Sequence, residues 1–397
     1  MNKNLSLPIG QTIMGFGTSL PYPVLFDPHT VINNNKGPAT LITGSPGSGK
    51  TFFGLLLAVQ ASICNKIGFI IDPKGDFPIL KEAERQGLCG KINLWSLFNV
   101  ENNTVDKKNW GILDPTILYD DIDKNIATTI NVIRMIHGDL NEEQSLMLTP
   151  IVSDVVKNKK KASFAQVVNV LQRSQSRTLQ NLGSSLRLSL NLPISKLLIK
   201  PPKAKRNRLD LRAGGVTVAS LLGIAIPSDG KDIEKYTIEE KISMAIMALV
   251  SLLVGELMST IDYSKQKLLI IDEARMIINT SVGNSMITDV ALLGRSMNMA
   301  TILLTQSPRH LNPTGGESKI NSTITTRFAF RNEDTNDNEL TVESMRLPKS
   351  SNWESLIESL NTGQCLMKDS HGQVGVVDII ARDDLARAFS TNPLERK

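Results

Sequence analysis

The chain has 397 residues and a net charge of +5, and its 41% hydrophobic and 21% charged content excludes an intrinsically disordered protein. The length suits one large α/β domain with an inserted module, or two domains. The three cysteines, Cys64, Cys89 and Cys365, lie far apart, which argues against a disulfide framework or a zinc ribbon and favours a reducing, cytoplasmic environment.

The amino-terminal third predicts a parallel βαβ unit. Residues 39–43 are a short apolar run that predicts a buried strand, residues 51–63 predict an aliphatic helix, and residues 67–71 predict a second strand before a turn at 72–76. Strand, glycine-rich loop, helix and strand in this order are typical of a parallel α/β fold. We therefore assign residues 1–120 to a lead-in segment and the first part of an α/β core.

Residues 121–212 change to an all-helical pattern that is strongly basic. Apolar residues recur at helical spacing, as in Ile126, Ile130 and Ile133, and strand signals vanish. Residues 155–209 contain thirteen Lys and Arg and no Asp or Glu, so the rest of the chain carries about −8. We interpret this segment as a helical insertion bounded by a basic loop.

Two interpretations of the basic segment remain open. It is either a solvated helical surface with a mobile basic loop, or a surface that contacts DNA phosphates, anionic lipid or an acidic partner protein. Phe164 is the only aromatic residue between 155 and 209, so base stacking would contribute little. DNA bound here would be held through its backbone, with an affinity that falls as salt rises.

The α/β pattern resumes in residues 213–397, the second part of the core. Strands are expected at 216–226, 268–271, 300–305 and 325–330, helices at 238–261 and 285–297, and a hairpin at 363–367 and 374–379. The long helix contains a stretch apolar enough to span a bilayer, but Glu256 lies inside it, so we interpret it as a buried core helix. The expected fold class is α/β, with a parallel-rich central sheet flanked by helices and an all-helical insertion.

The loop after the first strand matches the phosphate-binding pattern GxxxxGK[ST] in full. Its residues are Gly44, Ser45, Pro46, Gly47, Ser48, Gly49, Lys50 and Thr51. The glycines let backbone N–H groups turn inward around the β-phosphate of ATP, at the positive end of the following helix. We expect Lys50 to bridge the β- and γ-phosphates and the Thr51 hydroxyl to ligate Mg²⁺.

The apolar run 268–271 ends in Asp272 and Glu273, which complete a hydrolytic site. A central strand that ends in acids places them at the carboxyl edge of the sheet, where ligands bind. We expect Asp272 to hold Mg²⁺ through water, and Glu273 to polarise the attacking water as a general base. A purely structural salt bridge is the alternative, and the phosphate loop earlier in the chain argues against it.

Gln306 and Arg327 are the remaining candidates for the site. Gln306 ends the strand 300–305, where its amide can reach the γ-phosphate or its water and report the nucleotide state; a capping or loop glutamine is the alternative. Arg327 lies on the next strand, from which an arginine of a ring-forming ATPase can project into a neighbour's nucleotide. Arg295 and Arg331 are its rivals.

Four motifs are diagnostic in their order. They are the phosphate loop, LLIIDEAR (268–275), GRSMN (294–298) leading to ILLTQSP (302–308), and ITTRFAF (324–330). From about Pro23 onward the chain resembles the HerA–FtsK superfamily of hexameric motor ATPases. The helical insertion and the ending around LNTGQCL (360–366) are most similar to the ATPase half of the conjugation and type IV secretion ATPases of the TraC and TrsE type.

The resemblance implies a RecA-like P-loop NTPase that assembles as a homo-hexamer, binds ATP and Mg²⁺, and uses Gln306 as sensor and Arg327 as a finger acting in trans. It also implies a type IV secretion channel or coupling protein as partner, and a cytoplasmic location with peripheral membrane association as an option. These ATPases usually carry a large amino-terminal domain that docks on the channel, whereas a short segment precedes the phosphate loop here. We expect an excised ATPase domain or a short homologue.

Three functions follow as hypotheses. The leading one is an ATPase that powers conjugative DNA transfer, type IV secretion or pilus assembly, with a relaxase–DNA complex, pilus subunits or effector protein as cargo. The alternative is a DNA-pumping motor of the HerA, FtsK or viral-packaging type. A third, a non-hydrolysing scaffold with ATP as a structural ligand, is disfavoured by the intact Lys50, Asp272, Glu273 and Gln306.

Overall fold

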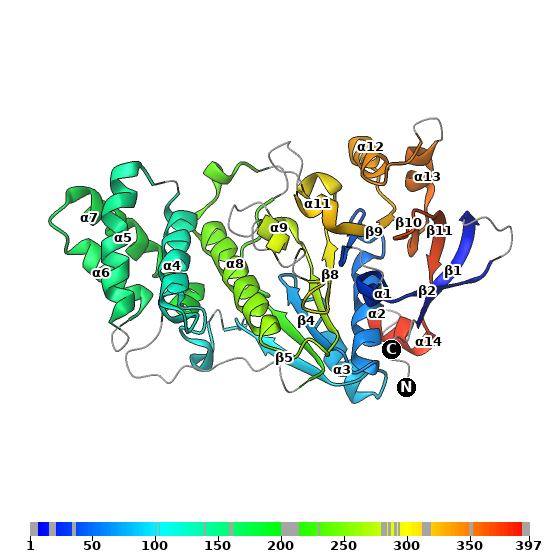
Figure 1. Ribbon diagram of the computed structural model, residues 1–397, viewed down its shortest axis with the longest axis horizontal. Coiled ribbons are helices and arrows are strands. Elements are labelled where there is room, and N and C mark those ends of the chain that lie inside the picture. Colours follow the sequence, from blue (N-terminus) through cyan, green and yellow to red (C-terminus); the bar gives the residue numbers. More distant parts are fainter. Residues whose placement is uncertain are drawn as a thin grey trace.

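The chain forms an elongated molecule with a sheet at its centre, a lobe of helices at one end and antiparallel strands at the other (Figure 1). The computed structural model describes residues 7–15, 21–33, 37–99, 101–102, 104–138, 140–158, 162–199, 214–228, 231–278, 284, 287–289, 292, 294–311, 319–348 and 352–390.

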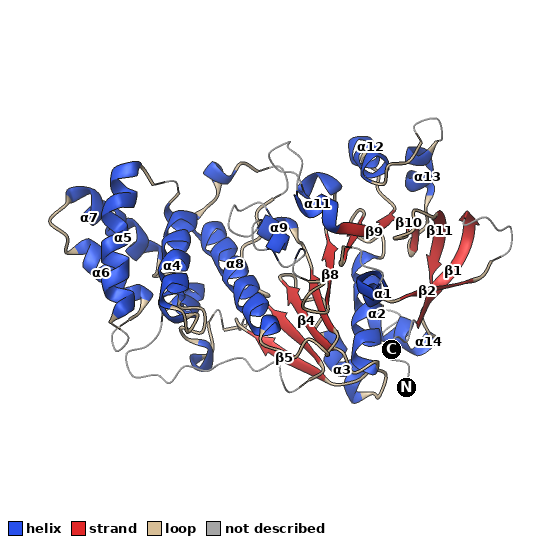
Figure 2. Ribbon diagram, viewed as in Figure 1, coloured by secondary structure: helices blue, strands red, loops and turns tan. Residues whose placement is uncertain are grey.

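One mixed sheet of 11 strands runs through the described part of the chain. Its parallel strands are, in their order across the sheet, β9 (Ile324–Phe330), β3 (Ala39–Thr43), β8 (Met299–Leu304), β7 (Lys267–Ile271), β4 (Ile67–Asp72), β6 (Val216–Ser220) and β5 (Ile92–Ser96). Beyond β9 the sheet continues with the antiparallel strands β10 (Gln364–Lys368), β11 (Val374–Ile379), β1 (Leu7–Gly15) and β2 (Pro23–Phe26). Figure 2 shows helices on both sides of these strands.

The strand order brings the two sequence motifs to one edge of the sheet. β3 leads into the phosphate loop and β7 leads into Asp272, with β8 between them. The register sets Ile42 of β3 beside Leu304 of β8, and Ile271 of β7 beside Leu303. Because these strands are parallel, their carboxyl ends meet at the edge where open α/β sheets bind ligands.

Helices cover both faces of the parallel strands, which explains why β3, β4, β7 and β8 are buried at every position. The covering helices are α2 (Lys50–Ile63), α3 (Ile79–Arg85) and α14 (Asp383–Phe389) on one face, and α8 (Ile238–Ser259) and α9 (Arg275–Ile278) on the other. Ile42 points into the first core, whereas its neighbour Leu41 points into the second. Successive residues of a strand therefore stabilise two separate layers.

The described chain between β5 and β6 is mostly helical. Its helices are α4 (Ile122–His137), α5 (Glu142–Lys157), α6 (Phe164–Gln172) and α7 (Arg177–Ser189), followed by the 3₁₀ helix η3 (Pro193–Leu198). Asp121 caps α4 with its side chain, and Asn141 forms a capping box with Gln144 at the start of α5. These helices share an apolar core with α8, so they form a lobe attached to one face of the sheet.

Helix α8 is a core helix. It is long and apolar enough to cross a membrane, but 72% of its most hydrophobic window is buried inside the protein. Thr237 caps its start through a capping box with Glu240, and Glu256 near its end pairs with Lys124 of α4 at 3.0 Å. The interpretation of this apolar stretch as a buried helix agrees with that burial.

The remaining described α-helices accompany the antiparallel end and its connections. They are α1 (Pro28–Asn33), α11 (Lys319–Thr323), α12 (Thr335–Ser344) and α13 (Trp353–Ser359). Helices α12 and α13 share a third, small core with strands β9–β11, which includes Ala329, Val342 and Ile357.

The predicted α/β class, with a mostly parallel sheet flanked by helices, is confirmed. The strand expected at 216–226 is too long, because β6 ends at Ser220. Leu221 makes a last contact with β4 by donating its N–H to the Asp72 carbonyl at 2.8 Å, and Gly223 then adopts a φ of 105° that turns the chain.

Some predictions concern residues that are described only in part or not at all, and three strands were not predicted. The helix expected at 285–297 is described in part: residues 287–289 and 292 are helical, and residues 294–297 form a turn. Residues 159–161 and 200–209 of the basic segment lie outside the described residues. Strands β1, β2 and β5 were not predicted. They lie at or near the two ends of the sheet, where one edge of a strand is unpaired and the apolar pattern is weaker.

A buried charged cluster ties the end of β2 to the central sheet. Lys66, just before β4, donates from Nζ to Asp27 Oδ1 at 2.7 Å and lies 3.1 Å from His29 Nδ1. His29 Nε2 lies 2.9 Å from the Lys267 carbonyl. Burial alone would raise the pKa of Asp27, but the hydrogen bond with His29 and the charge of Lys66 hold it well below its usual range. Burial is the chief cause that lowers the pKa of His29.

Candidate active site

The phosphate loop between β3 and α2 has a backbone that requires glycine. Gly44, Gly47 and Gly49 have φ angles of 146°, 75° and 111°, which side chains disfavour. A Cβ at Gly44 would lie 2.7 Å from the Phe330 Cβ, and a Cβ at Gly49 would lie 3.1 Å from the Gly363 nitrogen. Conformation and packing together hold the loop in the curled form that binds phosphate.

Lys50 opens α2 and folds back over the loop. Its Nζ donates to the Gly44 carbonyl at 2.5 Å and to the Ser45 carbonyl at 2.7 Å. Burial is the main cause that lowers the pKa of Lys50 to about 8, with Glu273 opposing it and Lys74 adding to it. The ammonium therefore lies within the loop that is expected to bind the phosphates.

Asp272, Thr51 and Ser48 supply oxygen atoms that fit a magnesium–phosphate group. Asp272 is buried, and its Oδ2 has no partner among the described residues; the same is true of Ser48 Oγ. Burial, followed by the charges of Glu273 and Asp72, raises the pKa of Asp272 to about 7. A divalent cation would relieve this crowding of acids, and Mg²⁺ prefers carboxylate, hydroxyl and water oxygens. Bound there, the ion would neutralise phosphate charge.

Glu273 is buried beside Asp272, and both of its oxygens are held. Gln306 Nε2 donates to Oε1 at 3.3 Å, Lys74 Nζ also donates to Oε1, and Arg275 Nε donates to Oε2 at 3.0 Å. Burial alone would raise the pKa of Glu273, but the hydrogen bond and charge of Lys74, and then the charge of Arg275, bring it below its ordinary value. The structure thus places the predicted Glu273 and Gln306 side by side.

Sequence reasoning missed Lys74, although a signal was present. The turn 72–76 follows β4, which is the neighbour of β7 in the sheet, with Ile71 opposite Ile271. Polar residues after two adjacent parallel strands lie at one edge. Had the order of β4 and β7 been known, Lys74 would have been expected beside the acidic pair.

A polar network connects the phosphate loop to the segment after Gln306. Ser45 Oγ donates to Asn332 Oδ1 at 2.8 Å, and Asn332 Nδ2 donates to Asp337 Oδ2 at 3.5 Å. Ser307 Oγ donates to Asp337 Oδ1 at 2.7 Å, and Arg309 pairs with the same carboxylate at 2.6 Å. The loop, the end of β9 and helix α12 are therefore mechanically linked to the predicted sensor.

Arg327 lies apart from this group of residues. Its guanidinium donates to the Ile324 carbonyl at 2.8 Å and to Asn321 Oδ1 at 2.9 Å. It pairs with Leu41 in the sheet, so its side chain emerges on the face opposite α2. Burial, followed by the charge of Arg346, lowers the pKa of Arg327 to about 10. In this chain Arg327 is held on the far side of the sheet from the phosphate-loop helix.

The two rival arginines occupy different edges of the sheet. The Arg331 carbonyl accepts a hydrogen bond from Ser45 N at 2.9 Å, and its side chain, 37% exposed, lies 4.0 Å from Glu333. Arg295 lies in the turn before β8, at the amino edge and so away from the phosphate loop. The structure brings Arg331, but not Arg295, next to the nucleotide site.

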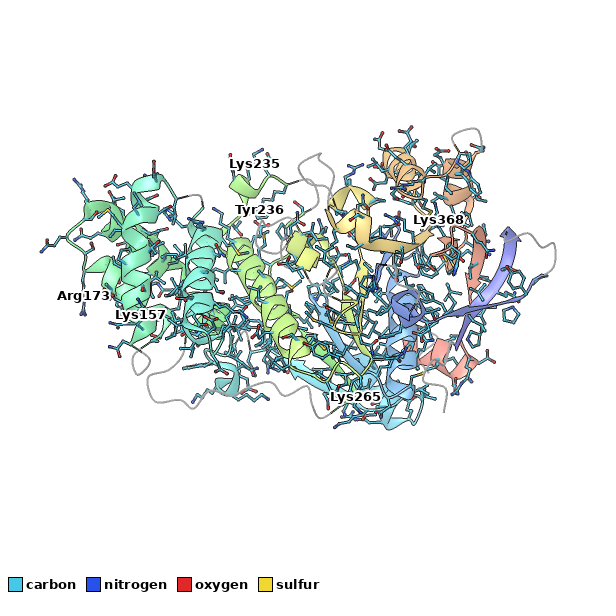
Figure 3. All side chains as sticks on the ribbon, viewed as in Figure 1. Lys157, Arg173, Lys235, Tyr236, Lys265 and Lys368 are labelled. Atoms are coloured by element: carbon cyan, nitrogen blue, oxygen red, sulfur yellow. The ribbon has the colours of Figure 1, made fainter. Side chains whose placement is uncertain are left out.

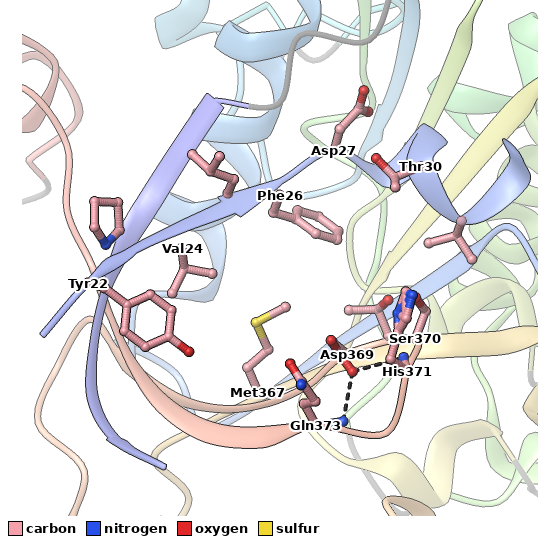
Figure 4. Close-up of a pocket in the computed structure, with 14 residues that line it drawn as sticks. Tyr22, Val24, Phe26, Asp27, Thr30, Met367, Asp369, Ser370, His371 and Gln373 are labelled. Carbon is pink, nitrogen blue, oxygen red and sulfur yellow. Dashed lines mark hydrogen bonds between the residues drawn. The ribbon is translucent and has the colours of Figure 1, made fainter. Parts of the chain in front are cut away.

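A pocket of about 360 Å³ lies elsewhere, between β2, the start of α1 and the β10–β11 turn (Figure 4). It is lined by residues that include Tyr22, Asp27, Met367 and His371, none of which belongs to the phosphate loop or the acidic strand. Asp27 is already paired with Lys66 at 2.7 Å. We therefore assign the chemistry of this protein to the phosphate-loop edge.

A protein-family model described as "AAA-like domain" matches residues 23–389. This chain belongs to the AAA-like domain family. The family and the complete phosphate loop make it a P-loop ATPase, and the loop and its acids fit ATP with Mg²⁺.

Three known proteins are similar to this AAA-like ATPase. The uncharacterized protein YddE of Bacillus subtilis (strain 168) is 24% identical over 371 residues, which cover 90% of this chain and 43% of YddE. The structure of VirB4 of Thermoanaerobacter pseudethanolicus matches with a TM-score of 0.70 and 15% identity over 100% of this chain and 99% of that chain. The plasmid coupling protein TrwB, solved in complex with ADP and Mg²⁺, matches with a TM-score of 0.53 and 13% identity over 92% and 88%.

These comparisons confirm the predicted P-loop ATPase fold, which the chain shares with VirB4 and with the plasmid coupling protein TrwB. The chain spans less than half the length of its curated relative YddE. The structural matches, at 15% and 13% identity, show a shared fold.

Proposed function

We propose that this AAA-like ATPase is the motor of a type IV secretion or conjugative transfer system, in which ATP hydrolysis drives the transfer of DNA, protein or pilus subunits. The observation that supports this most is the extent of the match to VirB4, which covers 100% of the chain and so includes the lobe α4–α7 as well as the nucleotide-binding core. We also propose that residues 121–212 act as a basic module inserted between the core halves 1–120 and 213–397.

In the proposed reaction, the phosphate loop and Lys50 hold the β- and γ-phosphates of ATP. Thr51 and Asp272 would hold the magnesium, which would neutralise phosphate charge when bound. Glu273 accepts a proton from the water that attacks the γ-phosphorus, the bond from that phosphorus to the β–γ bridging oxygen breaks, and ADP and phosphate leave. Gln306, hydrogen-bonded to Glu273, senses the change. Through Ser307 and the network described above, that change reaches helix α12.

The assembly we propose is a homo-hexamer at the cytoplasmic face of the cell membrane, in contact with the secretion channel or a coupling protein. In such a ring Arg327 of one subunit completes the site of its neighbour. Its position on the face opposite α2 supports a role outside its own phosphate loop.

A DNA-pumping motor is the second candidate function. Lys157, Arg173, Arg177 and Arg187 are exposed on the lobe α5–α7, and Figure 3 shows Lys157 and Arg173 at the end of the molecule far from the antiparallel strands. Cations in such a position can contact phosphates without reading sequence.

Steady-state ATP hydrolysis, measured with and without double- and single-stranded DNA at low and high salt, separates the two candidates. For a DNA motor we expect stimulation that collapses with salt, because each phosphate contact adds roughly 0.9 to the salt slope. The triple change Arg173→Gln, Arg177→Gln and Arg187→Gln should then reduce the slope by about three while basal hydrolysis is retained.

Arg85→Gln, which removes an exposed cation from α3 on the core, serves as the matched control and should leave stimulation unchanged. Lys50→Ala sets the background. Activity that is indifferent to DNA in the unaltered protein would contradict the DNA-pump reading and indicate a secretion ATPase whose activator is a channel protein.

Mixing inactive variants tests the finger in trans. Arg327→Ala subunits retain Lys50, and Lys50→Ala subunits retain Arg327, so an equal mixture should restore roughly a quarter of the sites, those where the two intact residues meet at a cyclic interface. The measurement is phosphate release from mixtures of the separately inactive proteins, with assembly checked by light scattering.

Arg331→Ala in place of Arg327→Ala is the comparison. Recovery with Arg331→Ala alone would assign the finger to Arg331, and no recovery with either, in assembled mixtures, would count against a finger supplied in trans by these two residues.

A further inference from the structure

A rigid turn holds Lys74 at the active-site edge. The Asp72 carboxylate, which is fully buried, accepts hydrogen bonds from the N–H groups of Gly75 (2.8 Å), Asp76 (3.2 Å) and Phe77 (3.1 Å). Gly75 has a φ of 80°, which suits a tight turn. The backbone of Lys74 is thereby fixed, while its side chain, 39% exposed, keeps room to move.

The Lys74 ammonium lies among the residues that handle the nucleotide. It forms an ion pair with Glu273 Oε1, on the same carboxylate that Gln306 contacts. Its charge also interacts with Asp272 and contributes to the lowered pKa of Lys50. The active site therefore contains a second lysine, supplied by the turn after β4 and not by the phosphate loop.

The ion pair conflicts with the role of Glu273. A general base needs a free oxygen lone pair directed at the attacking water. Lys74 and Gln306 occupy Oε1, and Arg275 occupies Oε2. These donors fill most of the roughly four lone-pair positions of the carboxylate and stabilise its charged form, so they make Glu273 a weaker base. Withdrawal of one donor would restore its basicity, and Lys74 is the donor with a flexible four-carbon stem and partial exposure.

The γ-phosphate of ATP is the group that would compete with Glu273 for the Lys74 ammonium. It carries more negative charge than one carboxylate and offers several acceptor oxygens to a single ammonium. ADP lacks the γ-phosphate, so in the ADP complex no such group competes with Glu273 for the Lys74 ammonium.

We propose that Lys74 is a positioning residue that restrains Glu273 and transfers to the γ-phosphate when ATP binds, so that the base is released only in the presence of ATP. This inference rests on the assignment of Glu273 as general base. The Lys74 ammonium restrains Glu273 in the absence of ATP and contacts the γ-phosphate in its presence, so it must exchange one partner for the other.

The test is the binding of a non-hydrolysable ATP analogue and of ADP, each with Mg²⁺, to the full chain by calorimetry. Lys74→Met preserves the length of the side chain and removes its charge. We expect it to weaken the ATP analogue about tenfold, as the loss of a charge-assisted hydrogen bond does, and to change ADP binding less than about twofold. Lys74→Arg should retain the preference for the ATP analogue.

A double-mutant cycle tests the exchange itself. Glu273→Gln removes the negative charge that competes for Lys74 and leaves only a neutral acceptor, so it should tighten binding of the ATP analogue more in the Lys74 protein than in the Lys74→Met protein. Lys265→Met, which alters an exposed lysine before β7 at the opposite edge (labelled in Figure 3), is the matched control and should leave both affinities unchanged.

If Lys74→Met weakened the binding of both nucleotides equally, or if the effects of the two substitutions on binding were additive, the exchange would be overturned. Lys74 and Glu273 would then form a structural ion pair only. Binding of neither nucleotide by the unaltered chain would overturn the ATPase assignment together with this role, so the two failures are distinguishable.

Discussion

Glu273→Gln is expected to lower kcat for ATP hydrolysis by about 10²–10⁴-fold, the usual contribution of a positioned general base. The amide has the shape of the carboxylate and can still accept a hydrogen bond from Lys74, but it cannot take the proton of the attacking water. The loss should therefore appear in kcat, and nucleotide binding should be no weaker. Phosphate release gives kcat, and calorimetry with a non-hydrolysable analogue gives the affinity.

Glu82→Gln is the matched control, because Glu82 is an exposed glutamate on α3 that pairs with Arg85 at the surface. It should leave kcat unchanged. Turnover in the unaltered protein that disappears in Glu273→Gln also excludes a non-hydrolysing scaffold. A kcat within threefold of the unaltered protein would show that another residue, or the substrate itself, accepts the proton.

Lys66→Met is expected to destabilise the fold by about 3–5 kcal/mol, the usual cost of removing one partner of a buried ion pair. Lys66 is 4% exposed and its Nζ contacts both Asp27 and His29. Asp27 Oδ2 has no partner among the described residues, so the loss of Lys66 leaves a buried carboxylate with little compensation. Urea unfolding at pH 8, followed by circular dichroism, measures the difference.

The cost of Lys66→Met should shrink as the pH falls from 8 to 6. Burial lowers the pKa of His29, and the charge of Lys66 lowers it further, whereas Asp27 raises it. Without Lys66 the pKa of His29 moves upward, so the folded variant binds more protons near pH 6 than the folded parent does. By linkage, the variant then gains stability relative to the parent as pH decreases, because His29 replaces Lys66 as the counter-charge of Asp27.

Lys265→Met, at an exposed lysine, should change the free energy of unfolding by less than about 0.5 kcal/mol at either pH. If Lys66→Met costs below about 1 kcal/mol at pH 8, the cluster contributes little net stability. A cost that does not vary with pH would show that His29 does not take over the role of Lys66.

The residues that act together within one motif can be predicted from the sequence alone. The phosphate loop is contiguous, so its glycines, Lys50 and Thr51 are recognised together. A run of aliphatic residues that ends in Asp272 and Glu273 predicts a strand with acids at its carboxyl end. Apolar periodicity likewise determined the alternation of strands and helices, because each element must bury one face or both.

Which of these elements are neighbours depends on how the whole chain packs. Periodicity predicts that a strand exists but not its place in the sheet, and the order β3–β8–β7–β4 is what brings Lys74 onto Glu273, 199 residues away in the chain. The same holds for Ser45 and Asn332, and for the direction in which Arg327 leaves β9. These contacts depend on the packing of two helical layers over the sheet, which is a property of the whole core and of no single stretch of sequence.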